Sequence, residues 1–164
     1  MKWQKGYTLI EILVGLTIIG FLFSFGYVSF RDFSRRQAVA GQAKSIQGDL
    51  RLAQETALAG QKPDDPLCNP PAVLNSYGFR VTTPTQYRIE ANCSDVIDSY
   101  EIIVKEVNLS PDLALSTSSV NPIEFKVLGQ GNNITAGTGV TLTLTQVATS
   151  NQTTITITSG GEIK

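Results

Sequence analysis

The sequence predicts an α+β protein in which one long N-terminal helix packs on an antiparallel β head domain. Three observations support this fold class. Residues 7–30 form an apolar run that contains one strongly ionised side chain, that of Glu11. A stripe of apolar residues at helical spacing follows it, and the C-terminal third contains segments in which apolar residues alternate with threonine. The helix is therefore predicted to have a transmembrane first half and an amphipathic second half.

The composition excludes several classes of function. The chain has 164 residues, 13 Lys and Arg against 14 Asp and Glu, and no histidine. A net charge of −1 gives no reason to expect a nucleic acid as partner. Without histidine there is no Ser-His-Asp or Cys-His nucleophile and no HExxH zinc site. We therefore expect that the protein is not an enzyme, that it has no catalytic residues and that it binds no cofactor.

Residues 7–30 are predicted to remain in the protein as a membrane anchor. At 1.5 Å per residue, a helix of this length reaches roughly 36 Å, enough to cross a hydrocarbon core of about 30 Å. A signal peptide has a shorter apolar core and a small-residue cleavage site, whereas this run continues directly into FRDFSRRQ. Lys2 and Lys5 lie before the run, and three arginines against one aspartate lie after it. Counting charges therefore leaves the orientation open.

Glu11 has two interpretations within this apolar run. A carboxylate in the apolar layer costs on the order of 2.5 to 3.5 kcal/mol on insertion scales. Glu11 either lies near the interface and extends its carboxylate toward water, or it has a partner that offsets this cost. The physics of insertion alone does not decide between them.

The residues around Glu11 resemble the prepilin leader of type IV pilins and type II secretion pseudopilins. A short basic leader ends in Gly6, Tyr7 begins the apolar helix, and Glu11 is the fifth residue after Gly6. The resemblance implies that prepilin peptidase cleaves between Gly6 and Tyr7 and N-methylates Tyr7. It also implies that Glu11 pairs with the terminal amine of a neighbouring subunit during filament assembly. Many relatives have a proline in this helix, and here there is none.

The second half of the helix is predicted from spacing alone. Its apolar residues recur at gaps of three and four, and they are Val39, Ala43, Ile46, Leu50, Ala53 and Ala57. One continuous helix is expected over residues 7–59, ending at Gly60 with Pro63 soon after. The stripe packs either on the protein's own head or against other subunits.

The remaining residues are predicted to form a β-rich head. A proline-rich loop covers residues 61–76. Strands are expected over residues 78–81, 86–91, 100–107, 123–128, 140–147 and 153–158, with a hairpin turn at 148–152. The predicted divisions of the chain are a leader at 1–6, a transmembrane and assembly helix at 7–30, an amphipathic helix at 31–60 and the head at 61–164.

The order of these segments adds a second resemblance, to the pseudopilin H and minor pilin T group. The matching motifs are RLAQETALAG at the end of the helix, YGFRV, PIEFKVLGQG and the two alternating strands before the tail. Some members of that group take up DNA through arginines in their last residues. Here the tail has Glu162 and Lys164 and no arginine, so this chain departs from those members at the positions that they use for DNA uptake.

Cys68 and Cys93 are the only cysteines, and both lie in the part predicted to leave the cytoplasm. A disulfide between them would close a loop and, by the loss of loop entropy in the unfolded chain, raise the free energy of unfolding by roughly 3.5 kcal/mol. The alternative is two free thiols, since two cysteines without histidine make a poor metal site. Four carboxylates suggest calcium but lack the spacing of a calcium loop, so solvated loops are expected at Asp64, Asp65, Asp95 and Asp98.

These observations predict a structural subunit, a minor pilin or pseudopilin of a type IV pilus or a type II secretion pseudopilus. Its expected partners are prepilin peptidase, other pilin or pseudopilin subunits and the membrane. It is expected to cross the cytoplasmic membrane once, with the head outside the cytoplasm, and then to join a filament. The alternative is a membrane-anchored binding module, such as an adhesin or a DNA-uptake minor pilin.

Overall fold

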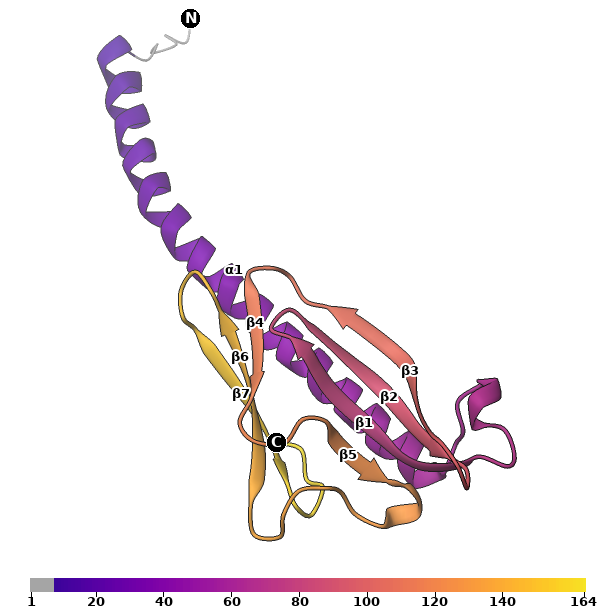
Figure 1. The fold of residues 1–164 in the computed structure, drawn as a ribbon. Helices are drawn as coiled ribbons and strands as arrows, with labels where there is room; N and C mark the ends of the chain where they lie inside the picture. The colour runs from indigo at the N-terminus through magenta and orange to yellow at the C-terminus, as the bar shows by residue number, and fades with distance from the viewer. Residues whose placement is uncertain (1–7) are drawn as a thin grey trace, which may run out of the picture. The chain divides into compact units, whose positions relative to one another are not determined.

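The described residues fold as one long α-helix and seven strands, in agreement with the predicted α+β class (Figure 1). The computed structural model describes the backbone of residues 8–164 and the side chains of residues 8–23 and 30–164. The chain divides into two compact units: unit 1 extends to Ala38, and unit 2 comprises Val39–Lys164. Helix α1, Leu9–Ala59, belongs to both units. The prediction of one uninterrupted helix is therefore confirmed over the described residues.

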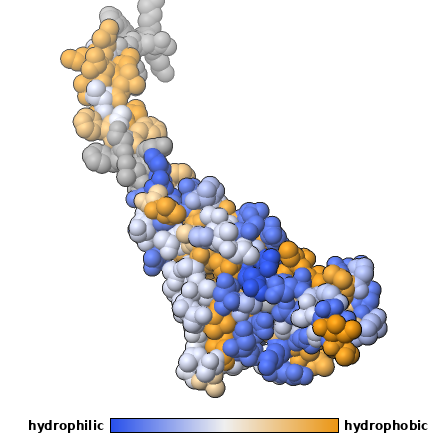
Figure 2. All heavy atoms as spheres, viewed as in Figure 1, coloured by the Kyte–Doolittle hydropathy of each residue, from blue (hydrophilic) through white to orange (hydrophobic). Residues whose placement is uncertain are grey.

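In unit 1, the start of α1 is apolar on all sides. The carbonyl of Thr8 accepts hydrogen bonds from the backbone N–H groups of Glu11, at 3.1 Å, and Ile12, at 3.3 Å. Every residue from 8 to 23 except Gly15 is exposed. Figure 2 shows this part of the helix as predominantly hydrophobic. The large exposed side chains are Leu9, Ile10, Ile12, Leu13, Val14, Leu16, Ile18, Ile19, Phe21, Leu22 and Phe23.

Hydropathy along the helix gives a separate result. Over the described residues, no helical window combines the length and the mean hydropathy expected of a membrane span.

In unit 2, the predicted apolar stripe of α1 is the centre of the core. All six of its residues are buried, and they pack with side chains from both sheets. The interpretation that the stripe packs on the protein's own head is confirmed. The helix ends in a Schellman motif, in which Gly60 N–H bonds to Ala57 O and Gln61 N–H to Thr56 O. Gly60 has a φ of 60°, which a residue without Cβ adopts at little cost.

Two antiparallel sheets form the rest of unit 2. One has the strand order β3-β2-β1-β5 and the other the order β4-β6-β7. The first sheet lies along the second half of α1 (Figure 1), and contacts from β2 and β3 reach this helix. The strands are β1 Val73–Thr83, β2 Gln86–Ser94, β3 Ser99–Asn108, β4 Leu113–Thr117, β5 Ile123–Lys126, β6 Gly139–Gln146 and β7 Gln152–Thr158.

All six predicted strands are present, and three details differ from the prediction. Strand β4 was not predicted, although its Leu113 and Leu115 alternate and are buried. The predicted loop at 61–76 is too long, because β1 begins at Val73 and pairs there with Ser94. Strand β5 ends at Lys126 and is followed by a 3-10 turn, η2 Val127–Gly129, because Leu128 has a φ of 54° that cannot continue a strand.

A buried carboxylate joins α1 to the first sheet. Asp49 is 7% exposed and lies on the core-facing side of the helix. Its Oδ2 accepts a hydrogen bond from the Tyr87 hydroxyl at 2.8 Å, and its Oδ1 is 2.7 Å from the Lys105 ammonium. Burial raises the pKa of the Tyr87 phenol, and the hydrogen bond to Asp49 raises it further. Asp49 thus connects the helix to both β2 and β3.

This tie predicts a loss of stability at alkaline pH. An unfolded chain releases its tyrosine protons near pH 10, whereas folded Tyr87 holds its proton to higher pH. The stabilisation is complete below about pH 10 and is lost as the pH rises through the folded pKa. We therefore expect the free energy of unfolding of unit 2 to fall above about pH 10, and to fall less in Tyr87→Phe. Urea unfolding at about pH 8 and about pH 11 measures this; equal losses in both proteins would contradict it.

Candidate functional site

The first candidate site is the start of α1, around Glu11. Glu11 lies in the first turn of the helix, where a negative charge interacts favourably with the helix dipole. Its carboxylate makes no hydrogen bond or ion pair with any other described residue, and it lies among exposed apolar side chains. Gly6 and Tyr7, the predicted cleavage and methylation positions, lie outside the described residues.

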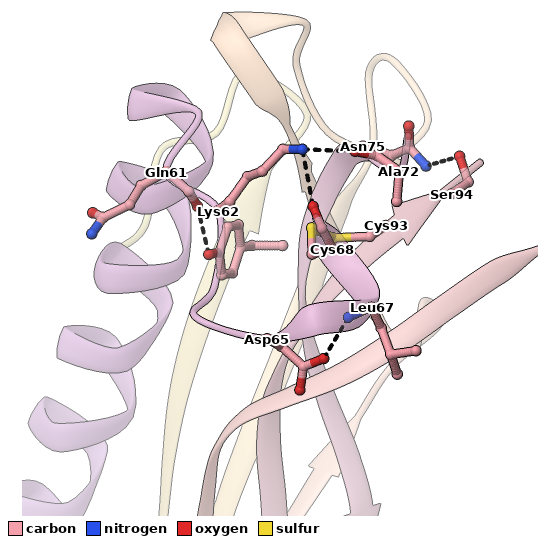
Figure 3. Close-up of a disulfide and its surroundings, with 10 residues drawn as sticks. Gln61, Lys62, Asp65, Leu67, Cys68, Ala72, Asn75, Cys93 and Ser94 are labelled. Carbon is pink, nitrogen blue, oxygen red and sulfur yellow. Dashed lines mark hydrogen bonds between the residues drawn. A yellow bond between two sulfur atoms is a disulfide. The ribbon is translucent and has the colours of Figure 1, made fainter. Parts of the chain in front are cut away.

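The second candidate site is the loop after α1, which is fastened to the first sheet (Figure 3). A disulfide joins Cys68, at the end of the 3-10 turn η1 (Pro66–Cys68), to Cys93 in β2, with 5.5 Å between their Cα atoms. The Lys62 ammonium points into the loop and donates to the carbonyls of Cys68, at 2.9 Å, and Ala72, at 2.7 Å. The disulfide therefore fixes the middle of the loop to β2, and Lys62 ties the start of the loop to its middle and its end.

The disulfide leads to a prediction about stability. Reducing it, or replacing both cysteines by serine, should lower the free energy of unfolding by about 3.5 kcal/mol, the loop-entropy value for a closed segment of this length. Urea unfolding of unit 2 with and without reductant gives the difference. The Cys68→Ser, Cys93→Ser protein, which reductant cannot affect, is the control. A loss below about 1 kcal/mol would contradict the prediction.

Two of the carboxylates considered as calcium ligands cap turns instead. Asp65 accepts a hydrogen bond from Leu67 N–H at 2.9 Å. Asp95 accepts from the N–H groups of Asp98, at 2.7 Å, and Ile97, at 2.8 Å. These two bonds, that from Asp98 first, lower the pKa of Asp95. Within the described part of the chain, no three His, Cys, Asp or Glu side chains gather as metal ligands do.

The outer face of the first sheet carries a charged cluster around Glu90. This carboxylate is fully buried, and the Arg80 and Arg88 guanidinium groups lie 2.6 Å and 2.9 Å from it. Glu101, on β3, also contacts both arginines. Gly78 faces Glu90 across the β1–β2 pair, and a Cβ there would lie 3.1 Å from Glu90 Cγ. Two of the three arginines of unit 2, Arg80 and Arg88, are therefore neutralised by carboxylates.

The tail of the chain lies along β7. Lys164 and Thr156 exchange two backbone hydrogen bonds of 3.0 Å. The side chains of Glu162 and Lys164 form an ion pair at 3.0 Å. The Gln54 amide on α1 donates to Gly161 O at 2.9 Å. The tail is thus a structural part of the head.

Comparisons with known proteins agree with this architecture. The family profile described as type II transport protein GspH matches residues 42–161, which is well over half of the chain. The chain belongs to the type II secretion pseudopilin H family. A second profile, the prokaryotic N-terminal methylation motif, matches residues 1–27. Searches of curated proteins and of solved structures gave no significant match.

Family membership makes this pseudopilin a relative of structural subunits of the type IV pilin and pseudopilin class. The two profiles divide the chain as its chemistry does. The methylation motif covers Gly6, Tyr7 and Glu11 together with the first apolar turns. The GspH profile covers α1 from residue 42 onward and the strands β1 to β7.

Several residues of this pseudopilin's surface and core were not predicted from its sequence. Asp49 lies three residues after Ile46 and four before Ala53, which places it beside the apolar stripe. A carboxylate at that position could have indicated a buried charge with a partner in the head. Glu90 belongs to the polar face of β2, and the alternation of that strand gives no sign that it is buried. Val96 and Ile97, an apolar pair in a turn between two aspartates, were also not singled out.

Proposed function

We propose that this pseudopilin is a structural subunit of a type II secretion pseudopilus or a type IV pilus, assembled through the first half of α1. The observation that carries the proposal is the start of that helix. Residues 9–23 expose large apolar side chains on all sides, directly within the methylation motif. Such a surface is stable only when a membrane or other helices cover it.

The proposed division of the chain follows from this role. Residues 1–6 are a leader that prepilin peptidase removes, and Tyr7 becomes the methylated first residue. Residues 7–30 insert in the membrane and later pack among other subunits. Residues 31–60 and 61–164 form the amphipathic helix and the head, which lies outside the cytoplasm, where the Cys68–Cys93 disulfide is stable.

Glu11 has a specific place in this proposal. In the filament its carboxylate pairs with the methylated amine of a neighbouring subunit. A buried carboxylate is costly alone, and a close cation offsets that cost. The lack of a partner for Glu11 among the described residues supports pairing with another molecule.

The structure favours the structural subunit over a DNA-binding module. Recognition of DNA needs cationic side chains that are free to reach phosphates. Here Arg80 and Arg88 are held by Glu90 and Glu101, and Lys164 is paired with Glu162. An adhesin role has no observation in its favour.

Processing is the direct test of the proposal. Co-expression of the full chain with a prepilin peptidase should remove the six residues before Tyr7 and add one methyl group to its amine. Intact-mass measurement, followed by fragmentation of the N-terminal peptide, detects both changes. A catalytically inactive peptidase is the control. A mature protein that retains Met1, or one cut after Phe30, would contradict the proposal.

A further inference from the structure

We propose that strand β3 is shaped so that it does not pair with a strand of another protein chain. Two features of the strand prevent such pairing. One is a bulge at Val104, and the other is Lys105, whose ammonium is turned inward onto Asp49 of α1. Together they protect the free edge of the first sheet. This property is independent of the role proposed above, because it concerns the folded head alone.

The two sheets have four edges, and the chain itself contacts three of them. The edge of β5 bonds to the loop that follows it, since Lys126 N–H donates to Gly131 O at 2.8 Å. The tail lies along the edge of β7. The edge of β4 meets the β1–β2 turn, where Leu115 N–H donates to Pro84 O at 2.7 Å. By contrast, no backbone hydrogen bond or bridge joins β3 to any described segment other than β2, and Figure 1 shows β3 as the outermost strand.

The uncovered edge is also the one best suited to pairing. Strand β3 has ten residues, against four in β5, five in β4 and seven in β7. Its centre is the β-branched run Ile102, Ile103 and Val104, of which Ile103 is 51% exposed and Val104 is 47% exposed. A long edge strand with exposed β-branched residues is a template for a strand of another chain. Without protection, such an edge is expected to associate.

The bulge interrupts this template at its centre. The register with β2 passes from Ile103 opposite Glu90 to Lys105 opposite Ile89, so Val104 has no partner on β2. An extra residue of this kind bends the strand, increases its local twist and disrupts the ladder of backbone hydrogen bonds. A regular strand laid against β3 can therefore pair on one side of Val104 or on the other, but not along the whole length.

Lys105 makes pairing unfavourable as well. It lies opposite Ile89, which is 2% exposed, so its side chain starts on the core-facing side of the sheet. Its ammonium is 2.7 Å from Asp49 Oδ1, and its side chain is 44% exposed, so water reaches it. A strand added beside β3 would remove that water, and the withdrawal of an ion pair from water is costly. An inward-turned charge on an edge strand thus opposes pairing.

Lys105 also neutralises Asp49, so its effect at the edge must be separated from its effect in the core. Asp49→Asn removes the buried charge and keeps an acceptor for the Tyr87 hydroxyl, which bonds to Asp49 Oδ2 at 2.8 Å. In this variant the Lys105 ammonium loses its partner but remains on β3. It is therefore a background in which Lys105 can be replaced without leaving a buried carboxylate unpaired.

The test measures self-association of the full chain, held as a single copy in each lipid nanodisc. The first variant is Asp49→Asn, the second adds Lys105→Val, and the third also deletes Val104, which restores an uninterrupted register with β2. Light scattering over a range of concentrations gives the association constant. The wild type and Asp49→Asn should remain monomeric. Each further change should raise the association constant by about tenfold, which corresponds to 1.4 kcal/mol.

Hydrogen exchange identifies the surface that associates. In the second and third variants, amides within residues 99–108 should exchange at least about tenfold more slowly when the chains associate than when they are dilute. A cooperative unfolding transition shows that each variant is folded. If the deletion of Val104 prevents folding, the comparison of Asp49→Asn with the Asp49→Asn, Lys105→Val variant decides the test.

Lys126→Val is the matched control. Lys126 is also an exposed lysine on an edge strand, β5, and its replacement also exchanges one cation for a β-branched residue. The loop after β5 covers that edge through Gly131. This variant should therefore remain monomeric.

Each result has a definite reading. Association that appears with Lys105→Val, increases when Val104 is deleted and slows exchange in β3 supports the proposal. Variants that remain monomeric overturn it, as do equal association in Lys126→Val, slower exchange confined to other segments, or association of the wild-type chain through β3. None of these results depends on prepilin processing, so the proposed function is tested separately.

Discussion

Glu11→Ala should enter the membrane and lose its leader as the wild type does, yet be depleted from filaments by at least about a hundredfold. Removing the carboxylate makes insertion easier, because a charged residue in the apolar layer is costly. Assembly differs, because it would leave the methylated amine of a neighbour buried without its partner. Breaking a buried ion pair on one side typically costs about 3 to 5 kcal/mol, and each 1.4 kcal/mol is tenfold.

The measurement is the ratio of variant to wild-type protein in sheared filaments, normalised to the membrane pools. Glu11→Asp, which keeps the charge, is the matched control and should be depleted less. Thr8→Ala, which changes a neighbouring residue outside the ion pair, should assemble normally. A ratio near one for Glu11→Ala would show that Glu11 only reaches toward water at the membrane interface.

Glu90→Ala should be the most destabilising single substitution on the outer face of the first sheet. The Glu90 side chain is fully buried and compensates both Arg80 and Arg88. Its removal leaves two guanidinium groups without this partner and a cavity beside Gly78. We expect a loss of about 3 to 5 kcal/mol in the free energy of unfolding.

Glu101→Ala is the matched control for this experiment. Glu101 contacts the same two arginines, but its side chain is 55% exposed. Water screens such a pair, so its removal should cost no more than about 1 kcal/mol. Urea unfolding of unit 2 compares the two variants. Equal losses would mean that burial of Glu90 contributes nothing to the strength of the cluster.

Periodic parts of the fold were predictable from the sequence. The stripe from Val39 to Ala57 repeats at helical spacing, and every one of its residues is buried. The last two strands alternate apolar residues with threonine, and β6 and β7 pair along that length. In both cases one face is buried, so the pattern and the packing have the same period.

Features without a period were not predictable in this way. The alternation in strand β4 comprises only Leu113 and Leu115, which gave no clear period in the sequence. The burial of Glu90 depends on arginines from two strands and on Gly78 across the ladder, which only the register brings together. The tie from Asp49 to Tyr87 joins residues 38 positions apart. Such contacts depend on the fold as a whole.

The candidate site divides in the same way. The proposed positions Gly6, Tyr7 and Glu11 could be named from the sequence because the methylation motif that contains them is short and linear. The exposure of Val96 and Ile97 could not, since two apolar residues in a sequence look the same whether they are buried or exposed. Their exposure of 99% and 87% is a property of the folded turn.

The contact between Gln54 and Gly161 has a consequence for how the head folds. These residues are 107 positions apart, yet the tail lies against the helix and along β7. The apolar stripe of α1 emerges early during synthesis, whereas three residues that cover part of it emerge last, namely Ile155, Ile157 and Ile163. A nascent chain therefore carries Ile46 and Leu50 incompletely covered until it is nearly finished. Because so many core contacts are distant in sequence, folding should be slow and should follow release of the tail, and a stalled chain is a natural target for chaperones and proteases.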